Sequence, residues 1–396
     1  MAKDPPAPKK DPKDPQAELD QLRGQIDAAD DKILGLLNQR AGLVGRVAEL
    51  KSELAVPFYV PSRERQIADR LSATNPGPFP TEAIRSVFQE IFSACLALEK
   101  GVRIAYLGPE GTFSHMAVKQ QFGLSARATP IGTIPGVFEE VARGSADFGV
   151  VPVENTTEGG IIHTFDTFLE SDLKISAEIA LEIHMCLLAR AGVALTEVER
   201  VYSIPVAAGQ CRRWLATHLP RASIVEARST ADGARLAHDD ARGAAVASEI
   251  AARLYDLVIL RRNIEDLAHN MTRFLVVGRE QATPTGKDKT SLLLVTKDEP
   301  GNLYRVLGAF AQRGLNMSKI ESRPSRRRPW EYVFFVDVDG HERDEAVAAA
   351  LADLRASCET LKVLGSYPRA DVSAPLPAPP PAPPPAPPPG PPPAAG

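Results

Sequence analysis

The spacing of apolar residues changes along this chain and divides it into parts. From Glu18 to Leu54 apolar residues recur every three or four positions, which predicts one long helix. Two shorter helices are expected at about Arg63–Ala73 and Thr81–Glu99, separated by the breaker Asn75-Pro76-Gly77-Pro78. The long helix has too little of its own chain to cover its apolar stripe, so we expect it to pair with a second copy. That stripe consists of Leu19, Leu22, Ile26, Ile33, Leu36 and Leu37.

Beyond this all-α unit, strand and helix patterns alternate. In residues 102–280 the alternation favours a largely parallel sheet with helices on both faces, and about Glu178–Leu260 reads as a second lobe inserted into the first. After a linker at Gln281–Lys289, the expected order is strand, helix, strand, strand, helix, strand, as in a ferredoxin-like fold. These six elements are Thr290–Thr296, Asn302–Arg313, Leu315–Glu321, Tyr332–Val338, Arg343–Ala356 and Leu361–Tyr367.

The chain is therefore expected to be multidomain, with an all-α unit at residues 17–100, a two-lobed α/β unit at 102–280 and an α+β unit at 289–369. Residues 1–16 are rich in Lys, Asp and Pro, and residues 370–396 are almost entirely Pro and Ala, so both are expected to be solvated, disordered tails. A Pro-rich segment can bind an SH3-like partner, but a plain extended tail is the favoured interpretation.

Composition narrows the classes of function. An apolar share of 44% in 396 residues is enough for several cores, and a net charge of −4 without a basic, aromatic-containing run argues against nucleic-acid binding. The four cysteines are far apart and form no C-x-x-C motif, so neither a disulfide framework nor a metal site is expected. No apolar run is long enough to cross a membrane, and the N-terminus is polar, so we expect a cytoplasmic protein with no membrane partner.

Three polar corners next to apolar strands carry the candidate chemistry. The strand Phe148–Val153 runs into Asn155, Thr156 and Thr157 and then two glycines. The strand Arg103–Leu107 runs into a polar turn over residues 108–114, and a third corner at residues 270–274 precedes the strand Leu275–Val277. Because ligands of α/β sheets bind where strand ends and helix N-termini converge, we expect one cleft for a small anion.

These corners read GPEGTFS, PVENTTEGG with HTFDTF, and NMTRF, and in this order and spacing they resemble prephenate dehydratase, the enzyme that makes phenylpyruvate. The three helices resemble the all-helical chorismate mutase domain that often precedes it. The turn at residues 298–303 and the run Glu321–Ser325 resemble an ACT regulatory domain. The resemblance covers about residues 18–369. It implies a dimeric three-helix mutase domain, a two-lobed dehydratase domain like periplasmic binding proteins with substrate between the lobes, and a ferredoxin-like ACT domain.

Chorismate is a dianion that rearranges to prephenate by a pericyclic shift, which needs fixed cations and a held geometry rather than a nucleophile or metal. Arg40 and Lys51 are 11 residues apart, which at about 100° per residue places them within about 20° on the long helix. Arg23 lies about 100° off that face, so it would serve the partner's site. By resemblance Glu99 would hydrogen-bond the ether oxygen, and Arg40, Lys51 and Glu99 would be catalytic. The implied mutase site comprises Arg23, Arg40, Lys51, Arg63, Glu64, Cys95 and Glu99.

Prephenate loses its ring hydroxyl and a carboxylate together, so a hydrogen-bond donor must face the departing hydroxyl. The resemblance points to Thr272, which would act by position rather than by acidity. Arg273 is expected to pair with a substrate carboxylate. The implied dehydratase site comprises Asn155, Thr156, Thr164, Gln210, Thr272, Arg273 and Phe274.

Two positions depart from the family pattern. Val60 stands where many mutases carry Asp, which removes one polar contact. Ser203-Ile204-Pro205-Val206 stands where the dehydratase family usually reads Ser-His-Pro-Gln, so two polar side chains have become apolar. Either those positions are not catalytic or the contact made by the second lobe has changed.

In the ACT segment the resemblance implies a sensor for phenylalanine, the pathway product, at an inter-subunit surface. The implied pocket comprises Gly301, Asn302, Leu303, Glu321, Ser322, Arg323 and Pro324.

Together these features predict a bifunctional enzyme, an isomerase and a carbon–oxygen lyase, that converts chorismate through prephenate to phenylpyruvate without a cofactor and is inhibited by phenylalanine. We expect a homodimer or a higher homo-oligomer. A mutase joined to a dehydrogenase would need a G-x-G-x-x-G after a strand, and none occurs. Two alternatives stay open, namely a dehydratase with a decayed mutase domain and a non-enzymatic amino-acid sensor.

Overall fold

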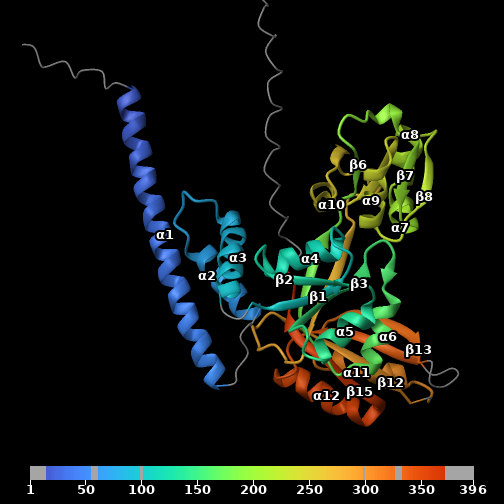
Figure 1. Cartoon of the computed structure of the whole chain (residues 1–396). Helices are drawn as coiled ribbons and strands as arrows, with labels where there is room; N and C mark the ends of the chain where they lie inside the picture. Colours follow the sequence, from blue (N-terminus) through green and yellow to red (C-terminus); the bar gives the residue numbers. More distant parts are fainter. Residues whose placement is uncertain (1–14, 55–60, 99–100, 298, 326–331, 371–396) are drawn as a thin grey trace, which may run out of the picture.

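The computed structural model describes residues 15–54, 61–98, 101–297, 299–325 and 332–370 (Figure 1). Val60, Glu99 and most of the two expected tails lie outside these ranges. Within them no helix combines the length and the apolar character that a membrane crossing requires.

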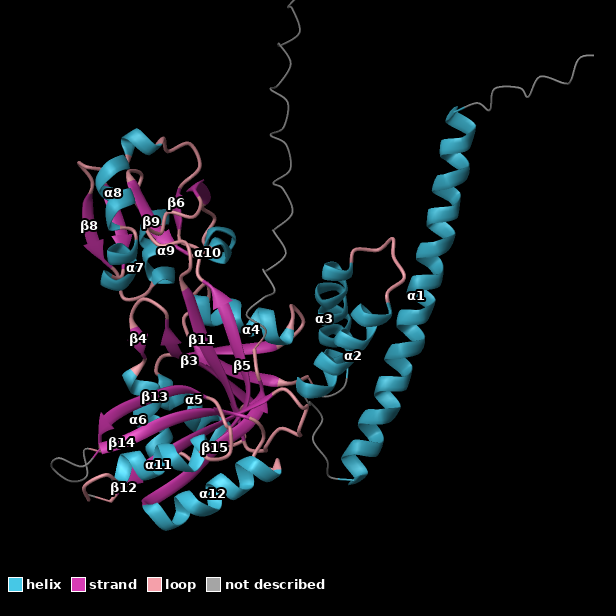
Figure 2. Cartoon of the chain, turned by 180° about the vertical axis from the view of Figure 1, so that it is seen from behind, coloured by secondary structure: helices cyan, strands magenta, loops and turns pink. Residues whose placement is uncertain are grey.

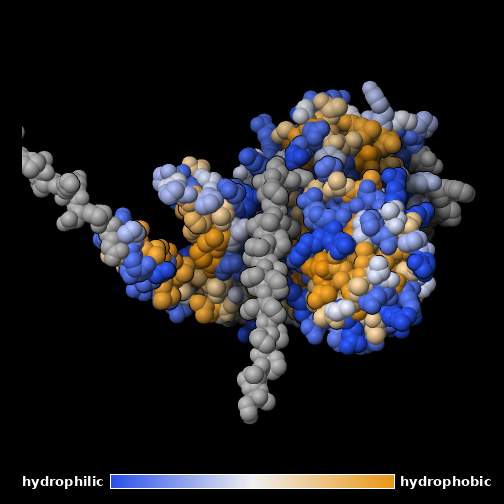
Figure 3. All heavy atoms as spheres, turned by 90° about the horizontal axis from the view of Figure 1, so that it is seen from above, coloured by the Kyte–Doolittle hydropathy of each residue, from blue (hydrophilic) through white to orange (hydrophobic). Residues whose placement is uncertain are grey.

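The N-terminal unit consists of the three expected helices, α1 (Pro15–Leu54), α2 (Pro61–Thr74) and α3 (Thr81–Leu98). α2 and α3 share a small core that includes Ala68, Ile84 and Phe92. The 40-residue α1 stands apart from the body of the protein and leaves its stripe exposed, with Ile26 59% and Leu36 64% accessible (Figures 1 and 3). An apolar face this long on one helix is typical of a surface that another chain covers.

The first α/β lobe is built on a sheet of order β2-β1-β3-β11-β5, with β4 paired to β3. Its strands are β1 (Arg103–Leu107), β2 (Arg127–Ile131), β3 (Phe148–Asn155), β4 (Gly159–Gly160), β5 (Lys174–Glu182) and β11 (Met271–Gly278). Its helices are α4 (Phe113–Phe122), α5 (Ile134–Ala142) and α6 (Ile162–Glu170). β1 is parallel to β2 and β3, but β11 is antiparallel to both β3 and β5. The expectation of a largely parallel sheet is therefore only partly right, because β11 returns from the second lobe beside the strand on which the chain left.

The second lobe has its own sheet of order β10-β6-β9-β7-β8. Its strands are β6 (Cys186–Ala189), β7 (Arg200–Ser203), β8 (Ser223–Glu226), β9 (Gly243–Ala247) and β10 (Val258–Arg261). Its helices are η1 (Leu195–Glu197), α7 (Pro205–Gln210), α8 (Arg212–His218), α9 (Thr230–Asp239) and α10 (Glu249–Leu254). The insertion begins after Glu182 rather than at Glu178, since all of β5 pairs with β11 in the first lobe.

The C-terminal unit follows the expected order and forms an antiparallel sheet, β13-β14-β12-β15. Its elements are β12 (Asp288–Thr296), α11 (Asn302–Ala311), β13 (Met317–Pro324), β14 (Tyr332–Asp339), α12 (Glu345–Ser357) and β15 (Cys358–Pro368). One sheet face packs on α11 and α12, and the other joins the core of the first lobe through Leu293, Phe335 and Leu364 (Figure 2). The sheet is thus enclosed between its own helices and the lobe that carries β3 and β11.

Candidate functional site

Asn155 and Thr272 lie directly opposite each other on β3 and β11. The Asn155 side-chain amide donates to Thr272 Oγ1 and to Asn270 Oδ1, each at 2.8 Å. The backbone N–H and the hydroxyl of Thr157 donate to Asn155 Oδ1 at 2.9 and 2.5 Å. The polar corner at residues 155–157 and the one at residues 270–274 therefore form one hydrogen-bonded site. Both strands run further than the sequence suggested, because these polar residues pair across the ladder instead of leaving it.

The second lobe reaches this site through Gln210, the last residue of α7. Its amide nitrogen donates to Thr157 Oγ1 at 2.9 Å, and its amide oxygen accepts from Asn270 Nδ2 at 2.9 Å. Thr156 closes the turn, since its hydroxyl donates to the His269 carbonyl at 3.1 Å and accepts from the Met271 N–H at 2.9 Å. Amides and hydroxyls from both lobes thus meet at the junction between them, and such a set can orient a hydroxyl and a carboxylate.

The polar corner at residues 108–114 contacts the second lobe at a different place. Ser248 Oγ donates to the Gly111 carbonyl at 2.6 Å, and the Tyr255 hydroxyl donates to the Glu110 carbonyl at 3.1 Å. His115 Nδ1 accepts the Gly111 N–H at 3.2 Å. Burial lowers the pKa of His115 and Lys119 lowers it further, against a smaller opposing effect of Glu110, so a neutral ring suits this acceptor role.

Thr164 and Phe274 do not reach this junction. Thr164 is fully buried and donates its hydroxyl to the Pro152 carbonyl at 2.5 Å, and Phe274 is 1% accessible within the hydrophobic core. Both positions serve packing, so the expectation that they contact substrate is wrong for this arrangement. Phe274 belongs to one hydrophobic core of the lobe, and Thr164 lies on α6 beside Phe165 and Phe168, which belong to another.

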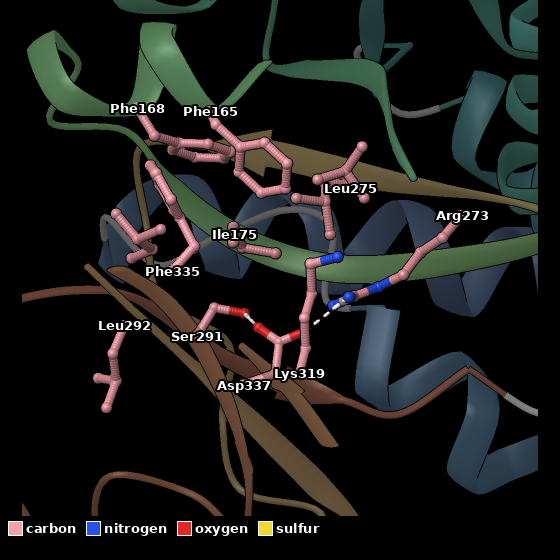
Figure 4. Close-up of a pocket in the computed structure, with 12 residues that line it drawn as sticks. Phe165, Phe168, Ile175, Arg273, Leu275, Ser291, Leu292, Lys319, Phe335 and Asp337 are labelled. Carbon is pink, nitrogen blue, oxygen red and sulfur yellow. Dashed lines mark hydrogen bonds and ion pairs between the residues drawn. The ribbon is translucent and has the colours of Figure 1, made fainter. Parts of the chain in front are cut away.

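Arg273 points toward the C-terminal domain, which contradicts the expectation that it meets a substrate carboxylate. Its Nη1 lies 2.6 Å from Asp337 Oδ2 (Figure 4). Its Nε lies 2.7 Å from Glu178 Oε2, and its Nη2 donates to the Tyr367 hydroxyl at 2.8 Å. Successive residues of a strand face opposite sides, so Arg273 cannot share the direction of Thr272. Burial alone would lower the pKa of the Arg273 guanidinium, but Tyr367, Asp337 and Glu178 together raise it.

In the N-terminal unit the structure brings together Arg40 and Cys95. Arg40 Nη1 donates to Cys95 Sγ at 2.9 Å, and the guanidinium lies 5.0 Å from the centre of the Phe92 ring. Lys51 and Glu64 are half-buried, whereas Arg63 is exposed. Arg23 is also exposed and pairs with Asp20 at 3.3 Å, remote from Arg40 along α1. One protomer therefore assembles part of the expected cationic site.

In the C-terminal unit the two expected pocket segments lie at the same end of the sheet, where Val295, Val333 and Arg323 form one cross-strand row. Gly301 has a positive φ of 75° before α11, and the buried Asn302 side chain donates to the carbonyls of Lys297 and Ser357 at 3.1 and 3.2 Å. Leu303 is 38% accessible.

Burial alternates along β13 and divides the second pocket segment. Ser322 and Pro324 are exposed, while Glu321 and Arg323 are half-buried on the side of the first lobe, where Arg323 Nε lies 3.7 Å from Asp166 Oδ1. Only Ser322 and Pro324 therefore present their side chains to the outer face.

Sequence reasoning missed the residues that join the C-terminal sheet to the dehydratase-like lobe. These residues surround Arg273 and are Glu154, Glu178, Lys289, Lys319, Asp337 and Tyr367. Burial raises the pKa of the Tyr367 phenol and the Asp337 carboxylate raises it further, so Tyr367 stays protonated. The charged residues Lys319, Glu321 and Arg323 stand at every second position, and this period was the available signal for a buried charged face.

Three family models match successive parts of the chain. Chorismate mutase type II matches residues 22–100, prephenate dehydratase matches residues 104–282, and the ACT domain matches residues 290–356.

Similar proteins match nearly the whole chain. The bifunctional chorismate mutase/prephenate dehydratase of Aquifex aeolicus is 50% identical over 357 residues, which cover 89% of this chain and 98% of that protein. Its namesake from Pseudomonas aeruginosa is 42% identical over 360 residues, 90% of this chain and 99% of that protein. Among solved structures, the prephenate dehydratase from Arthrobacter aurescens in complex with L-Phe has a TM-score of 0.64 at 37% identity and covers 69% of this chain and 92% of its own.

Proposed function

This chain belongs to the bifunctional chorismate mutase/prephenate dehydratases with a C-terminal ACT domain, and from that premise we propose which residues carry each activity. It rearranges chorismate to prephenate, converts prephenate to phenylpyruvate, and is subject to feedback by phenylalanine. The mutase domain is assigned to residues 17–100, the dehydratase domain to 102–280 and the ACT domain to 289–369.

The hydrogen bond from Asn155 to Thr272 is the observation that carries the dehydratase assignment. Because Thr272 Oγ1 accepts a hydrogen bond from the Asn155 amide at 2.8 Å, its own O–H is left to donate elsewhere. We assign that proton to a hydrogen bond with the departing hydroxyl of prephenate. The donor stabilises charge as the C–O bond breaks, while the ring carboxylate leaves as CO₂ and its electron pair completes the aromatic ring.

The remaining polar residues at the junction hold the substrate. Gln210 bridges Thr157 and Asn270, so closing the second lobe onto the first completes the site. Thr156 and Asn155 fix the turn against which a carboxylate of prephenate binds. Binding that brings the lobes together also excludes water from the reacting bond.

For the mutase reaction, Arg40 and Lys51 are assigned to the chorismate carboxylates and the ether oxygen, with Arg63, Glu64 and Cys95 around them. Arg40 lies between Cys95 and Phe92, which holds its guanidinium in place. Glu99, outside the described residues, is assigned to the ether oxygen. Exposed Arg23 and the uncovered stripe of α1 support a homodimer in which Arg23 enters the partner's site.

In the ACT domain, phenylalanine is assigned to the end of the sheet where Gly301, Asn302 and Leu303 lie near Ser322 and Pro324. Gly301 is exposed with a left-handed backbone before α11, and Leu303 offers an apolar contact. The neighbour from Arthrobacter aurescens that was solved with L-Phe supports this effector.

A cytoplasmic location is proposed for this enzyme. All four cysteines, Cys95, Cys186, Cys211 and Cys358, are buried free thiols, which suits a reducing compartment.

The test of the whole assignment is to supply the purified protein with chorismate and follow phenylpyruvate. Turnover of chorismate to phenylpyruvate, with phenylalanine lowering the rate, is the expected result. Accumulation of prephenate would remove the dehydratase assignment. No consumption of chorismate, with added prephenate still converted, would indicate a decayed mutase domain. Phenylalanine binding without turnover of either substrate would indicate a sensor.

A further inference from the structure

Two neighbouring cross-strand pairs at the ends of β3 and β11 face opposite sides of the first lobe. Thr272 lies opposite Asn155, and Arg273 lies opposite Glu154. The next pair is Phe274 with Pro152, so the register skips Val153 and forms a bulge. The bulge turns Glu154 to the same face as Arg273, the face covered by the ACT sheet. The pair next to the proposed catalytic pair is therefore an inter-domain pair.

The ACT sheet holds both members of this inter-domain pair. Asp337 on β14 lies 2.6 Å from Arg273, and Lys319 on β13 lies 2.7 Å from Glu154 Oε1. Arg273 and Glu154 are themselves 3.7 Å apart. The side chains of Arg273, Asp337 and Lys319 are only 17%, 8% and 11% accessible. Desolvated charges with such partners hold one geometry, because leaving any of them unpaired is costly.

Arg273, Glu154, Lys319 and Asp337 are called the charged row below. β13 connects this charged row to the end of the ACT sheet to which phenylalanine is assigned. Lys319 lies two residues before Glu321 on the inward face of β13, and a Cβ on Gly160 would lie 3.4 Å from Glu321 Cδ. β13 therefore touches the dehydratase lobe both at the end of β3 and at β4. A small cavity adjoins these residues, lined by Lys319, Arg273 and Asp337 on one side and by Phe165 and Phe335 on the other (Figure 4).

We propose that Arg273 and Glu154 are positioning residues for the dehydratase reaction, and that Lys319 and Asp337 transmit the state of the ACT domain to Thr272 and Asn155 through them. This inference rests on the proposed roles of Thr272 as donor and of phenylalanine as effector. With the row intact, the end of β3 and the start of β11 hold Thr272 Oγ1 where the departing hydroxyl needs it. Phenylalanine beside β13 favours a packing in which the row shifts and that hydroxyl moves away.

Lys319→Met in the full-length protein tests this inference, and Lys362→Met is its matched control. Lys362 also joins the ACT sheet to the dehydratase lobe, but its ammonium donates to the carbonyls of Phe168 and Ser171 and pairs with Asp172 at 3.6 Å instead of with Glu154 or Arg273. For each variant, prephenate kcat and KM, phenylalanine inhibition, and phenylalanine binding by calorimetry are measured. Chorismate consumption reports whether the mutase domain is intact.

For Lys319→Met we expect dehydratase kcat to fall about tenfold with KM nearly unchanged, because a displaced donor weakens the reaction more than binding. The phenylalanine concentration for half inhibition rises at least about tenfold, while the binding constant for phenylalanine changes less than about threefold. Lys319→Arg restores both properties, and Lys362→Met leaves them as in the wild type. Asp337→Asn, which keeps the side-chain shape, gives the same pattern from the other strand and replaces Lys319→Met if that variant does not fold.

The inference would be overturned if Lys319→Met and Asp337→Asn were half inhibited at the same phenylalanine concentration as the wild type. An equal loss in Lys362→Met would overturn it too, since any loosening of the interface would then suffice. Loss of phenylalanine binding in step with inhibition would place Lys319 in the effector pocket instead. The two premises are tested separately. If the wild-type protein binds no phenylalanine, phenylalanine is not the effector. If Thr272→Ala turns over prephenate at the normal rate, Thr272 is not the hydrogen-bond donor.

Discussion

Asn155 and Thr272 are 117 positions apart in the chain, yet the amide of one donates to the hydroxyl of the other at 2.8 Å across the β3–β11 ladder. The direction of this hydrogen bond matters because it leaves the threonine O–H available for the donor role proposed above. Gln210 from the second lobe completes the same network through Asn270. The proposed dehydratase site thus lies at the point where the chain returns from the inserted lobe.

Thr272→Ala should lower dehydratase kcat by about 100- to 1,000-fold, the scale of losing one placed hydrogen-bond donor. Mutase activity in the same preparation should stay near normal, which controls for folding. The measurement is phenylpyruvate formation from added prephenate. Thr272→Ser, which keeps the hydroxyl, should retain more activity than Thr272→Ala; equal rates for the two variants would remove the hydroxyl from the mechanism.

Arg40→Ala should stop chorismate consumption while added prephenate is still converted to phenylpyruvate. Arg40 touches Cys95 and Phe92 within the helical domain, and the Asn155–Thr272 site lies in a separate domain. The exposed Arg46, on the same helix, offers a control, since Arg46→Ala should leave both activities in place. If both activities of well-folded Arg40→Ala fell together, the separation of the two sites would have to be abandoned.

Gly365→Ala should destabilise the contact between the ACT and dehydratase domains. A Cβ on Gly365 would lie 2.4 Å from the Ile175 carbonyl oxygen and 2.8 Å from its nitrogen, and backbone atoms cannot move aside cheaply. Overpacking of this kind costs about 1–3 kcal/mol, which denaturant unfolding would detect. Gly308→Ala in α11, where a Cβ meets only the end of the Gln312 side chain at 3.9 Å, is the control and should be tolerated. Unchanged stability in Gly365→Ala would mean that β15 and β5 are less closely packed.

The free energy of unfolding should fall as pH drops below about 6.5, because His115 is harder to protonate in the folded protein. Burial lowers the pKa of His115 in the folded protein, so the unfolded chain takes up this proton first. The contribution of His115 is therefore complete above the unfolded pKa and is lost as pH falls from there toward the folded pKa. Protonation of Nδ1 would also remove the acceptor of the Gly111 N–H.

The check for His115 is the midpoint of denaturant unfolding at about pH 7.5 and about pH 5.5. His115→Asn keeps an acceptor but cannot take up this proton, so its loss of stability between the two conditions should be smaller than in the wild type. Equal slopes for wild type and His115→Asn would assign the pH dependence to other groups.

The sequence by itself determined the order and type of the three domains. The three-to-four-residue period of α1, the alternation of strands and helices after residue 101, and the β-α-β-β-α-β order at the C-terminus are local patterns, and local patterns survive in the fold. The polar corners at strand ends identified the segments that carry Asn155 and Thr272, because turn and strand-end residues are set by short-range chemistry. Gln210 was expected only from the resemblance to prephenate dehydratase.

Only the tertiary structure decided which way those residues point. Thr272 and Arg273 are neighbours in one motif, but strand alternation sends one to the lobe junction and the other to Asp337 in the ACT domain. The bulge at Val153 then brings Glu154 to the side of Arg273, and nothing in the local sequence fixes the register in which β3 meets β11. Strand direction, register and the sheet packed against each face depend on residues between 64 and 165 positions away. For that physical reason the charged row between the domains could not be predicted from the two motifs that contain Arg273 and Glu154, two of its four members.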